Sequence, residues 1–189
     1  RNVDQLKELS NSRLQIIQGD LCSDYENIIE QIKKLNLSIN ILINNAALVI
    51  NKAISEVTNN DLTILMETNF TGPYKLIRDL LPLFISGSHI VNISSMSGFQ
   101  GSEKFPGLTL YGSSKAALAS LSECVAVELR EQQIFCNCLA LGAVDTDMIK
   151  LSIPGLKPVV TAPQIANYIY NFSLVGNQYF NGQVLPVQL

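Results

Sequence analysis

The sequence predicts an α/β fold: a doubly wound parallel sheet between two layers of helices, which is a three-layer α/β/α arrangement. Short apolar runs alternate along the chain with longer segments whose apolar residues recur at helical spacing. Chains that alternate in this way form parallel sheets through right-handed crossovers. Polar residues also follow directly after several apolar runs, and the carboxyl ends of parallel strands are where such sheets bind ligands.

The predicted strands are short apolar runs, at residues 14–19, 39–43, 90–93, 135–141 and 184–187. The run 39–43 is broken only by Asn40, which is typical of a parallel strand covered on both faces. We expect all of these runs to join one sheet.

The predicted helices cover residues 6–9, 23–35, 60–84, 111–129 and 164–172. Residues 6–9 have the pattern of the middle of a helix that has already begun. Ser23 or Asp24 can cap the second segment, and Gly72-Pro73 interrupts the third. The segment 111–129 has apolar residues at helical spacing, several alanines, and no proline and only one glycine, which favours a continuous helix.

Length and composition indicate one domain over residues 1–189. The chain is 47% hydrophobic and carries a formal net charge of −3, which argues against nucleic acid or an anionic membrane as its main partner. No run approaches the roughly 18 apolar residues that a membrane span needs, and the first residues do not resemble a signal peptide. We expect a cytoplasmic protein.

The chain has four cysteines without a CxxC motif and a single histidine, His89. Buried free thiols in a reduced compartment explain such cysteines best, and no metal site is expected. One histidine with no supporting motif makes Ser-His hydrolase chemistry improbable.

Tyr111 and Lys115 are four residues apart in a predicted helix, so they stand on one face, one turn apart. An ammonium beside a phenol favours the phenolate and lowers the phenol pKa from about 10, which makes tyrosine a usable acid or base. A surface tyrosine and lysine on a helix are the alternative. The polar residues that follow the apolar runs argue against that alternative, namely Asp20, Asn44-Asn45, Ser94-Ser95 and 142–146.

Six short motifs occur in a fixed order along the chain: Asp20-Leu21, Asn44-Asn45-Ala46-Ala47, Asn69, Ser95, the Tyr111/Lys115 pair and residues 142–146. Together they resemble the classical short-chain dehydrogenase/reductase family over essentially the whole chain. The resemblance implies a Rossmann-like fold and an oxidoreductase that transfers a hydride between a nicotinamide cofactor and a carbonyl or secondary alcohol.

The resemblance implies that Asn69, Ser95, Tyr111 and Lys115 are catalytic. Tyr111 would give the proton to the developing alkoxide and Ser95 would hold the carbonyl oxygen. Lys115 would lower the Tyr111 pKa and grip the ribose hydroxyls, and Asn69 would keep a water that re-protonates the site.

The resemblance also implies a cofactor-binding set. Asp20 and Leu21 would contact adenine, and Asn45 and Ala46 would lie beside the adenosine part. Val144 and Thr146 would hold the nicotinamide carboxamide, and Tyr111 and Lys115 would contact the ribose. Arg1 would follow a strand and pair with a 2′-phosphate, which favours NADP(H) over NAD(H).

The chain departs from the family pattern in three places. No G-x-G-x-x-G occurs and the first glycine is Gly19, so we expect the glycine-rich strand-helix-strand to precede Arg1. Ala47 and Leu141 replace the usual glycine and proline. The segment from Ser95 to Tyr111 is a few residues longer than is typical, and its glycines and prolines are expected to shape the pocket.

A ketone or 3-oxoacyl-type compound is the expected substrate. Residues 147–163 form the expected substrate loop, whose apolar side chains would make a pocket wall: Met148, Ile149, Leu151, Ile153 and Leu156. Two alternatives stay open. One is a cofactor-sensing or scaffolding family member with little turnover. The other is an epimerase or dehydratase of the extended branch, against which stands the short stretch after Thr146.

The segments 60–84 and 111–129 carry apolar residues on more than one face. One sheet face cannot cover all of them, so we expect a homodimer or homotetramer in which these two helices pack against a second copy.

Overall fold

A computed structural model of the chain describes residues 14–153, 155–156 and 158–188. Arg1 and the predicted helix at 6–9 lie outside the described residues. The chain divides into two compact units, the first ending at Leu37 and the second running from Ser38 to Leu189. The single domain expected over residues 1–189 stays a prediction.

In the first unit, helix α2 spans Tyr25–Lys34, close to the predicted 23–35. The predicted strand at 14–19 is wrong: these residues have no regular secondary structure and pair with no strand in the described part of the chain. A β-strand is defined by its hydrogen bonds to a neighbouring strand. The apolar pattern of a single run does not show whether such a neighbour is present. Asp20 instead begins a turn, in which its Oδ1 accepts from Cys22 N at 2.8 Å.

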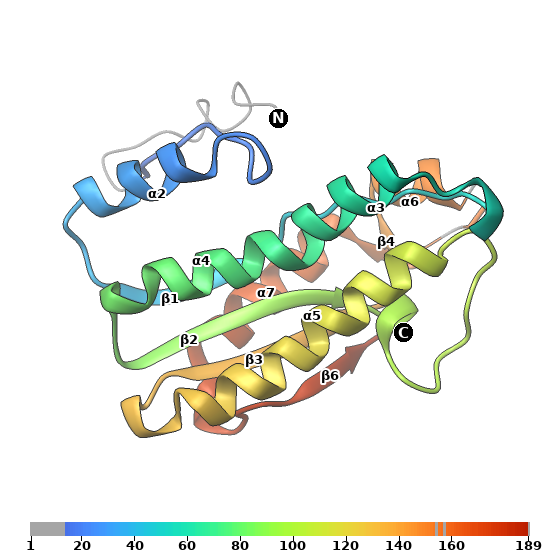
Figure 1. Cartoon of the computed structure of the whole chain (residues 1–189). Helices are drawn as coiled ribbons and strands as arrows, with labels where there is room; N and C mark the ends of the chain where they lie inside the picture. Colours follow the sequence, from blue (N-terminus) through green and yellow to red (C-terminus); the bar gives the residue numbers. More distant parts are fainter. Residues whose placement is uncertain (1–13, 154, 157, 189) are drawn as a thin grey trace. The chain divides into compact units, whose positions relative to one another are not determined.

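The second unit is built on a parallel sheet whose strands, in the described residues, lie in the order β1-β2-β3-β6 (Figure 1). The strands are β1 (Ile39–Asn44), β2 (Phe84–Ser95), β3 (Phe135–Leu141) and β6 (Val184–Val187). The runs predicted at 39–43, 135–141 and 184–187 are confirmed. Strand β2 begins six residues before the predicted 90–93, because Phe84 already pairs with Ile39 across an irregular register.

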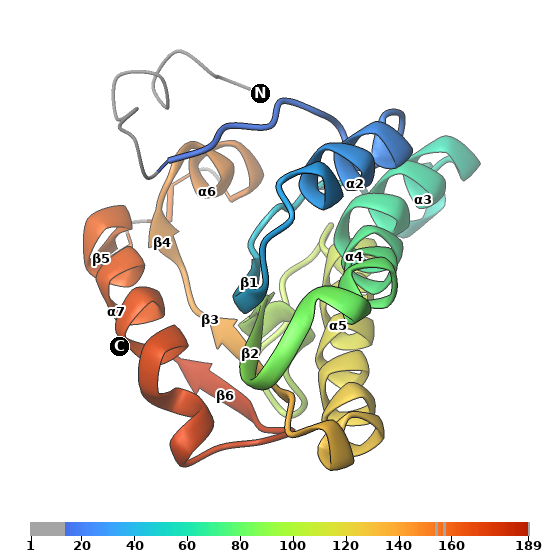
Figure 2. The same cartoon turned by 90° about the vertical axis from the view of Figure 1, so that its left-hand side faces the viewer.

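Helices cover both faces of this sheet, which confirms the three-layer α/β/α fold (Figure 2). On one face lie α3 (Asn59–Met66), α4 (Gly72–Leu80) and α5 (Thr109–Glu128). On the other face lies α7 (Ala162–Val175), whose Phe172 packs in a buried cluster with Val91, Ile93 and Leu139. Helix α7 is longer than the predicted 164–172 because Pro163 occupies its first turn, where a missing N–H costs nothing.

The predicted helix 60–84 is a chain of helical pieces rather than one interrupted helix. A π turn over Glu67–Thr71 joins α3 to α4, and a 3₁₀ turn over Leu81–Leu83 follows α4 before Phe84 enters β2. Pro73 has no N–H to give to the carbonyl of Asn69, four residues earlier. The π turn accommodates this, with Gly72 N donating to Glu67 O.

Amide side chains link the sheet to its helices on each face. On the α5 side, Asn44 Nδ2 donates to Asn92 Oδ1 at 2.7 Å, and Asn92 Nδ2 donates to Ser122 Oγ at 2.8 Å. On the α7 side, Asn137 Nδ2 donates to His89 Nε2 at 3.0 Å, and His89 Nδ1 donates to Ser173 O at 3.0 Å. Buried polar groups need such partners, so these contacts fix where each helix lies on the sheet.

The predicted substrate loop 147–163 has secondary structure of its own. It contains helix α6 (Asp147–Ser152) and strand β5 (Val160–Thr161), and β5 pairs in parallel with β4 (Val144–Asp145). The loop therefore leaves and rejoins the fold at a fixed place. No helix in the described residues combines the length and apolar character needed to cross a membrane.

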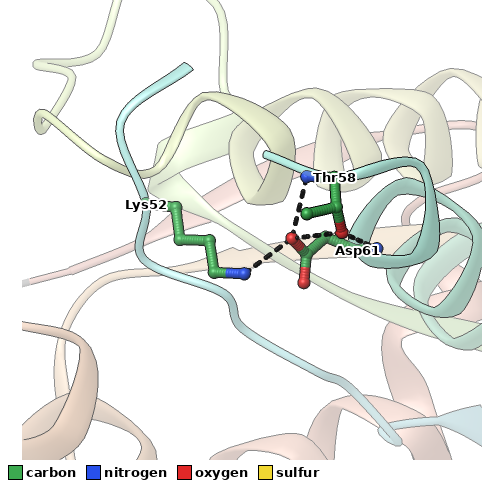
Figure 3. A network of polar contacts seen from close by, with 3 residues as sticks. All are labelled: Lys52, Thr58 and Asp61. Carbon is green, nitrogen blue, oxygen red and sulfur yellow. Dashed lines mark hydrogen bonds and ion pairs between the residues drawn. The ribbon is translucent and has the colours of Figure 1, made fainter. Parts of the chain in front are cut away.

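A polar network starts helix α3 and ties it to the segment after β1 (Figure 3). Asp61 Oδ2 accepts from Lys52 Nζ at 2.7 Å, from Thr58 N at 2.9 Å and from Thr58 Oγ1 at 2.8 Å. Asp61 N donates back to Thr58 Oγ1 at 3.1 Å, which completes a capping box. The Lys52 hydrogen bond and those from Thr58 lower the pKa of Asp61 to about 2.

Loss of this cap is expected to destabilise the protein. Thr58→Ala removes the hydroxyl that accepts from Asp61 N, and such substitutions cost about 1 kcal/mol of unfolding free energy. Thr63→Ala is the matched control, because the exposed Thr63 hydroxyl only donates to Asn59 O inside the same helix. Urea unfolding of both variants tests this; equal stability of Thr58→Ala and Thr63→Ala would contradict the role of the cap.

Stability is also expected to depend on His89. Burial holds the pKa of His89 below its ordinary 6.5, against a smaller opposing effect of its hydrogen bond to Ser173. On acidification, His89 in the unfolded chain therefore takes up a proton at a higher pH than His89 in the folded chain. The contribution of His89 to the free energy of unfolding is complete above about pH 6.5 and is lost as the pH falls below that value.

Urea unfolding on either side of this pH, for the wild type and for His89→Gln, measures the effect. His89 is the only histidine, so the variant should lose most of the pH dependence near neutrality. A wild type equally stable on both sides of this pH would refute the prediction.

Candidate active site

A cavity of about 1120 Å³ opens in the second unit beside the carboxyl ends of β2 and β3. Its lining includes most of the residues that the sequence singled out in this unit: Asn45, Ser95, Tyr111, Lys115, Val144 and Thr146. Parallel strands end at the same edge of the sheet, and this is why residues so far apart in the sequence meet here.

Ser95 is the last residue of β2 and the first residue of a tight turn. Its backbone is extended, and its Oγ accepts a hydrogen bond from Ser97 N at 3.1 Å. Because this bond uses only a lone pair of the oxygen, the hydroxyl proton is available to a second acceptor. Ser95 also hydrogen-bonds with the side chain of Tyr111.

The start of α5 lies unusually close to the turn after β2, and two glycines make this possible. A Cβ on Gly98 would lie 2.5 Å from Ala116 N, and one on Gly112 would lie 2.8 Å from Ser97 O. Both distances are too short for a real side chain. Ser94 Oγ also donates to Lys115 O at 2.7 Å. Tyr111 and Lys115 are thereby held against the end of β2.

Lys115 is a buried cation, with only 2% of its surface exposed. Its Nζ donates to Ile93 O at 2.8 Å and lies 5.9 Å from the centre of the Tyr111 ring. Burial lowers the pKa of Lys115 to about 8, and Cys138 opposes this shift. At neutral pH the side chain is therefore mostly an ammonium ion.

The Tyr111 pKa moves in the direction opposite to the one expected. Burial of the phenol raises its pKa, and the hydrogen bond with Ser95 only partly opposes this. The expected lowering by Lys115 is wrong for this structure, because the ammonium donates to Ile93 O and lies over the ring. Tyr111 is consequently a protonated phenol at neutral pH.

Asn69 does not line the cavity, because its side chain is fully buried and hydrogen-bonded to two other segments of the chain. Its Nδ2 donates to Leu48 O at 2.8 Å and Ser114 Oγ at 3.0 Å, and its Oδ1 accepts from Leu48 N at 2.8 Å. These bonds fix the segment after β1 to the second turn of α5. The side-chain amide is thus occupied, and the main-chain carbonyl receives no α-helical hydrogen bond from Pro73, which has no N–H.

The predicted cofactor-binding residues divide into three groups. Asn45, Val144 and Thr146 line the cavity, with Thr146 also capping α6. Ala46 does not line the cavity, although its neighbours Asn45 and Ala47 do. Asp20 and Leu21 belong to the first unit and Arg1 lies outside the described residues, so their roles stay predictions.

The chemistry of the cavity wall suits the nicotinamide ribose. An ammonium has three N–H groups, and among the described residues Ile93 O accepts from one of them. The buried Lys115 ammonium thus keeps donors for a vicinal diol, with the Tyr111 hydroxyl beside it on the same wall. Gly142 also lines the wall, and its N donates to Val187 O at 2.8 Å, which holds this stretch of backbone in place.

The rest of the cavity lining is mainly apolar, and the sequence analysis predicted only part of it. Met148, Ile149, Ile153 and Leu156 line the cavity as predicted, and the Leu151 side chain lies outside the description. Residues that the sequence analysis missed also line it: Val49, Glu103, Phe105, Gln164, Ile165, Tyr168 and Ile169. The α7 members recur at helical spacing, a signal that could have revealed them.

Comparisons with known proteins agree with this geometry. The family model described as "short chain dehydrogenase" matches residues 1–155. The chain is 29% identical to 3-oxoacyl-[acyl-carrier-protein] reductase FabG of Chlamydia trachomatis, over 79% of this chain and 64% of the relative's length. It thus spans less than two thirds of that protein.

Two solved structures are similar in fold. A 4-hydroxyisoleucine dehydrogenase complexed with NADH and succinate is 23% identical, with a TM-score of 0.84 over 99% of this chain and 84% of that one. A blue fluorescent protein from a metagenomic library, in complex with NADPH, is 27% identical, with a TM-score of 0.79 over 91% of this chain and 73% of that one. Because the family model covers most of the sequence, the chain belongs to the short-chain dehydrogenase family.

Proposed function

We propose that the protein is an NAD(P)(H)-dependent oxidoreductase that transfers a hydride between a nicotinamide cofactor and a carbonyl or secondary alcohol. One observation carries the proposal: Ser95, Tyr111 and the buried ammonium of Lys115 lie on the same cavity wall, at the carboxyl ends of the parallel strands. This arrangement supplies a proton donor, a hydrogen-bond donor and a positive charge at one place.

The cofactor, when bound, supplies or accepts the hydride at the substrate carbon. In the reducing direction, the protonated Tyr111 donates its phenol proton to the substrate oxygen. Ser95 donates a hydrogen bond to the same oxygen as charge develops there, and keeps its own proton. Since its Oγ is already held by Ser97 N, the hydroxyl is oriented before the substrate arrives.

Lys115 and Asn69 have supporting roles in this proposal. The Lys115 ammonium would donate hydrogen bonds to the ribose hydroxyls of the cofactor. Asn69 fixes the second turn of α5 through Ser114, and its main-chain carbonyl holds the water that returns a proton to the site.

We further propose that NADP(H) is preferred over NAD(H), on the basis of Arg1. Asp20 and Leu21 would contact adenine, and Asn45 and Ala46 would lie beside the adenosine part. The titles of the similar structures name both NADH and NADPH, which supports a nicotinamide cofactor without favouring either form.

A ketone or 3-oxoacyl-type compound is the proposed substrate. The wall formed by residues 148–160 is mainly apolar. Among the described residues that line the cavity, Glu103 and Lys115 are the charged ones. Since we assign Lys115 to the ribose, the cavity holds no other cation for a substrate carboxylate. The name of the Chlamydia trachomatis relative, a 3-oxoacyl-[acyl-carrier-protein] reductase, supports this substrate class.

We also propose a homodimer or homotetramer through the helices at 60–84 and 111–129. The side chains of Leu62, Tyr74 and Val127 on these helices are between 43% and 65% exposed. These helices already cover the sheet and still expose large apolar side chains, which a second copy would bury. The four cysteines are all free thiols, and this supports the proposed cytoplasmic location.

Tyr111→Phe is expected to lower turnover with NADPH and a 3-oxoacyl thioester at least ~10²-fold, the lower end of what a positioned general acid contributes. NADPH affinity should stay within a few-fold, because Lys115 still reaches the ribose. Tyr179→Phe is the matched control, since Tyr179 is 76% exposed and does not line the cavity. Steady-state rates and NADPH titrations measure both effects.

A Tyr111→Phe enzyme with the full rate would end the assignment. A wild type that binds NADPH tightly but reduces no compound in a panel of ketones and 3-oxoacyl thioesters would favour the cofactor-sensing alternative.

The rate of carbonyl reduction is expected to fall as the pH rises through about 8, the pKa of Lys115. Above that pH the lysine loses its charge, and with it the charge-assisted hydrogen bonds to the ribose hydroxyls. The tyrosine itself, with a pKa raised above 10.0, still holds its proton there. A pH profile of kcat/KM for reduction measures this; a rate that holds until the pH approaches the ordinary range of tyrosine would contradict it.

A further inference from the structure

The loop between Ser95 and Tyr111 contains a cation that no motif predicts. Lys104 Nζ donates to Phe99 O at 2.6 Å, to Ser102 Oγ at 2.8 Å and to Ser97 O at 2.9 Å, with Met96 O farther away at 3.5 Å. Three main-chain carbonyls and a hydroxyl of one loop therefore converge on a single ammonium. Hydrogen bonds with a charged donor are among the strongest in proteins.

Ser102 completes this arrangement. Its Oγ lies within hydrogen-bond distance of Met96 O and of Phe99 O, the latter at 2.8 Å. The backbone adds Phe99 N to Met96 O at 3.1 Å and Ser102 N to Phe99 O at 3.4 Å. The segment 96–104 is thus a closed loop whose polar atoms face inward, toward the Lys104 ammonium.

The two ends of the longer segment 96–108 are held by other contacts. At the beginning, Gly98 packs directly against the backbone of α5. At the end, Lys52 N donates to Gly107 O at 3.0 Å. Between these anchors the Lys104 ammonium connects the carbonyls of Ser97 and Phe99 with the hydroxyl of Ser102.

This middle part forms one wall of the cavity. Gly101, Ser102, Glu103 and Phe105 line the cavity, whereas Lys104 itself does not. The exposed Lys104 side chain therefore lies away from the cavity, while its two neighbours in sequence line it. A loop that opened would move Glu103 and Phe105 away from a substrate.

We propose that Lys104 is a positioning residue: its ammonium is the internal cation that holds residues 96–105 in the conformation that lines the substrate cavity. The hydrogen-bond distances and the cavity lining carry this inference. Its consequence for turnover rests on the proposed function, whereas its consequence for the loop does not.

Lys104→Met tests the effect on the loop, because it keeps the length of the side chain and removes the charge. Backbone amide hydrogen exchange over residues 96–105 should become at least about tenfold faster, as expected for the loss of one charge-assisted hydrogen bond. Lys104→Arg, which keeps the charge, should restore most of the protection. Lys34→Met is the matched control, since Lys34 is an exposed lysine paired with Glu30 on α2, and it should leave this loop unchanged.

Chemical rescue separates an internal cation from a packing role. Lys104 is exposed, so a small cation can reach the carbonyls when the side chain is shortened in Lys104→Ala. Methylammonium chloride should slow exchange in this variant more than sodium chloride at the same ionic strength. Equal effects of the two salts would overturn the assignment of the ammonium as the organising group.

Kinetics test the link to the site. With a 3-oxoacyl thioester, Lys104→Met should raise KM more than it lowers kcat, because the wall moves while Ser95, Tyr111 and Lys115 stay in place. Unchanged exchange in Lys104→Met overturns the proposal, and so does faster exchange with an unchanged KM. If the wild type reduces no carbonyl compound, the proposed function fails, and the exchange and rescue measurements decide the role of Lys104 on their own.

Discussion

The close contact between the end of β2 and the first turns of α5 is the constraint on which the candidate site depends. Gly98 and Gly112 let the two backbones touch, and Ser94 Oγ holds Lys115 O from the strand side. Because of this contact, Lys115 is almost entirely buried, and its ammonium donates a hydrogen bond to Ile93 O. A buried cation is costly unless it is hydrogen-bonded. The helix start, the lysine and the strand end are therefore one unit, and a larger residue at either glycine would separate all three.

The sequence predicted those parts of the fold that depend on local pattern. Residues 39–43, 135–141 and 184–187 are mainly apolar runs, the first two each broken by one asparagine, and each forms a strand of the sheet. Residues 14–19 have a similar pattern but no partner strand in the described part of the chain, and pairing cannot be read from a single run. The π turn at Glu67–Thr71 was also out of reach, because the helical pattern on each side of it is regular.

In the candidate site, too, the sequence predicted which residues take part but not the environment that surrounds each of them. The motifs identified Ser95, Tyr111 and Lys115, and the structure brings these three together on one wall. The motifs could not reveal that burial raises the Tyr111 pKa. They also could not reveal that the Asn69 side chain is already hydrogen-bonded to Leu48 and Ser114. Those properties depend on the neighbours that each atom acquires on folding, and residues far apart in the sequence supply them.

The pairing of β6 with β3 bears on how the protein matures during synthesis. Val187 and Gln188 line the cavity, and Val187 O accepts from Gly142 N. A nascent chain that has made Ser95, Tyr111 and Lys115 still lacks this wall until β6 has left the ribosome and joined the sheet. Such pairing between distant segments forms late, because loop closure must precede it. Completion of the cavity wall therefore waits for completion of the sheet.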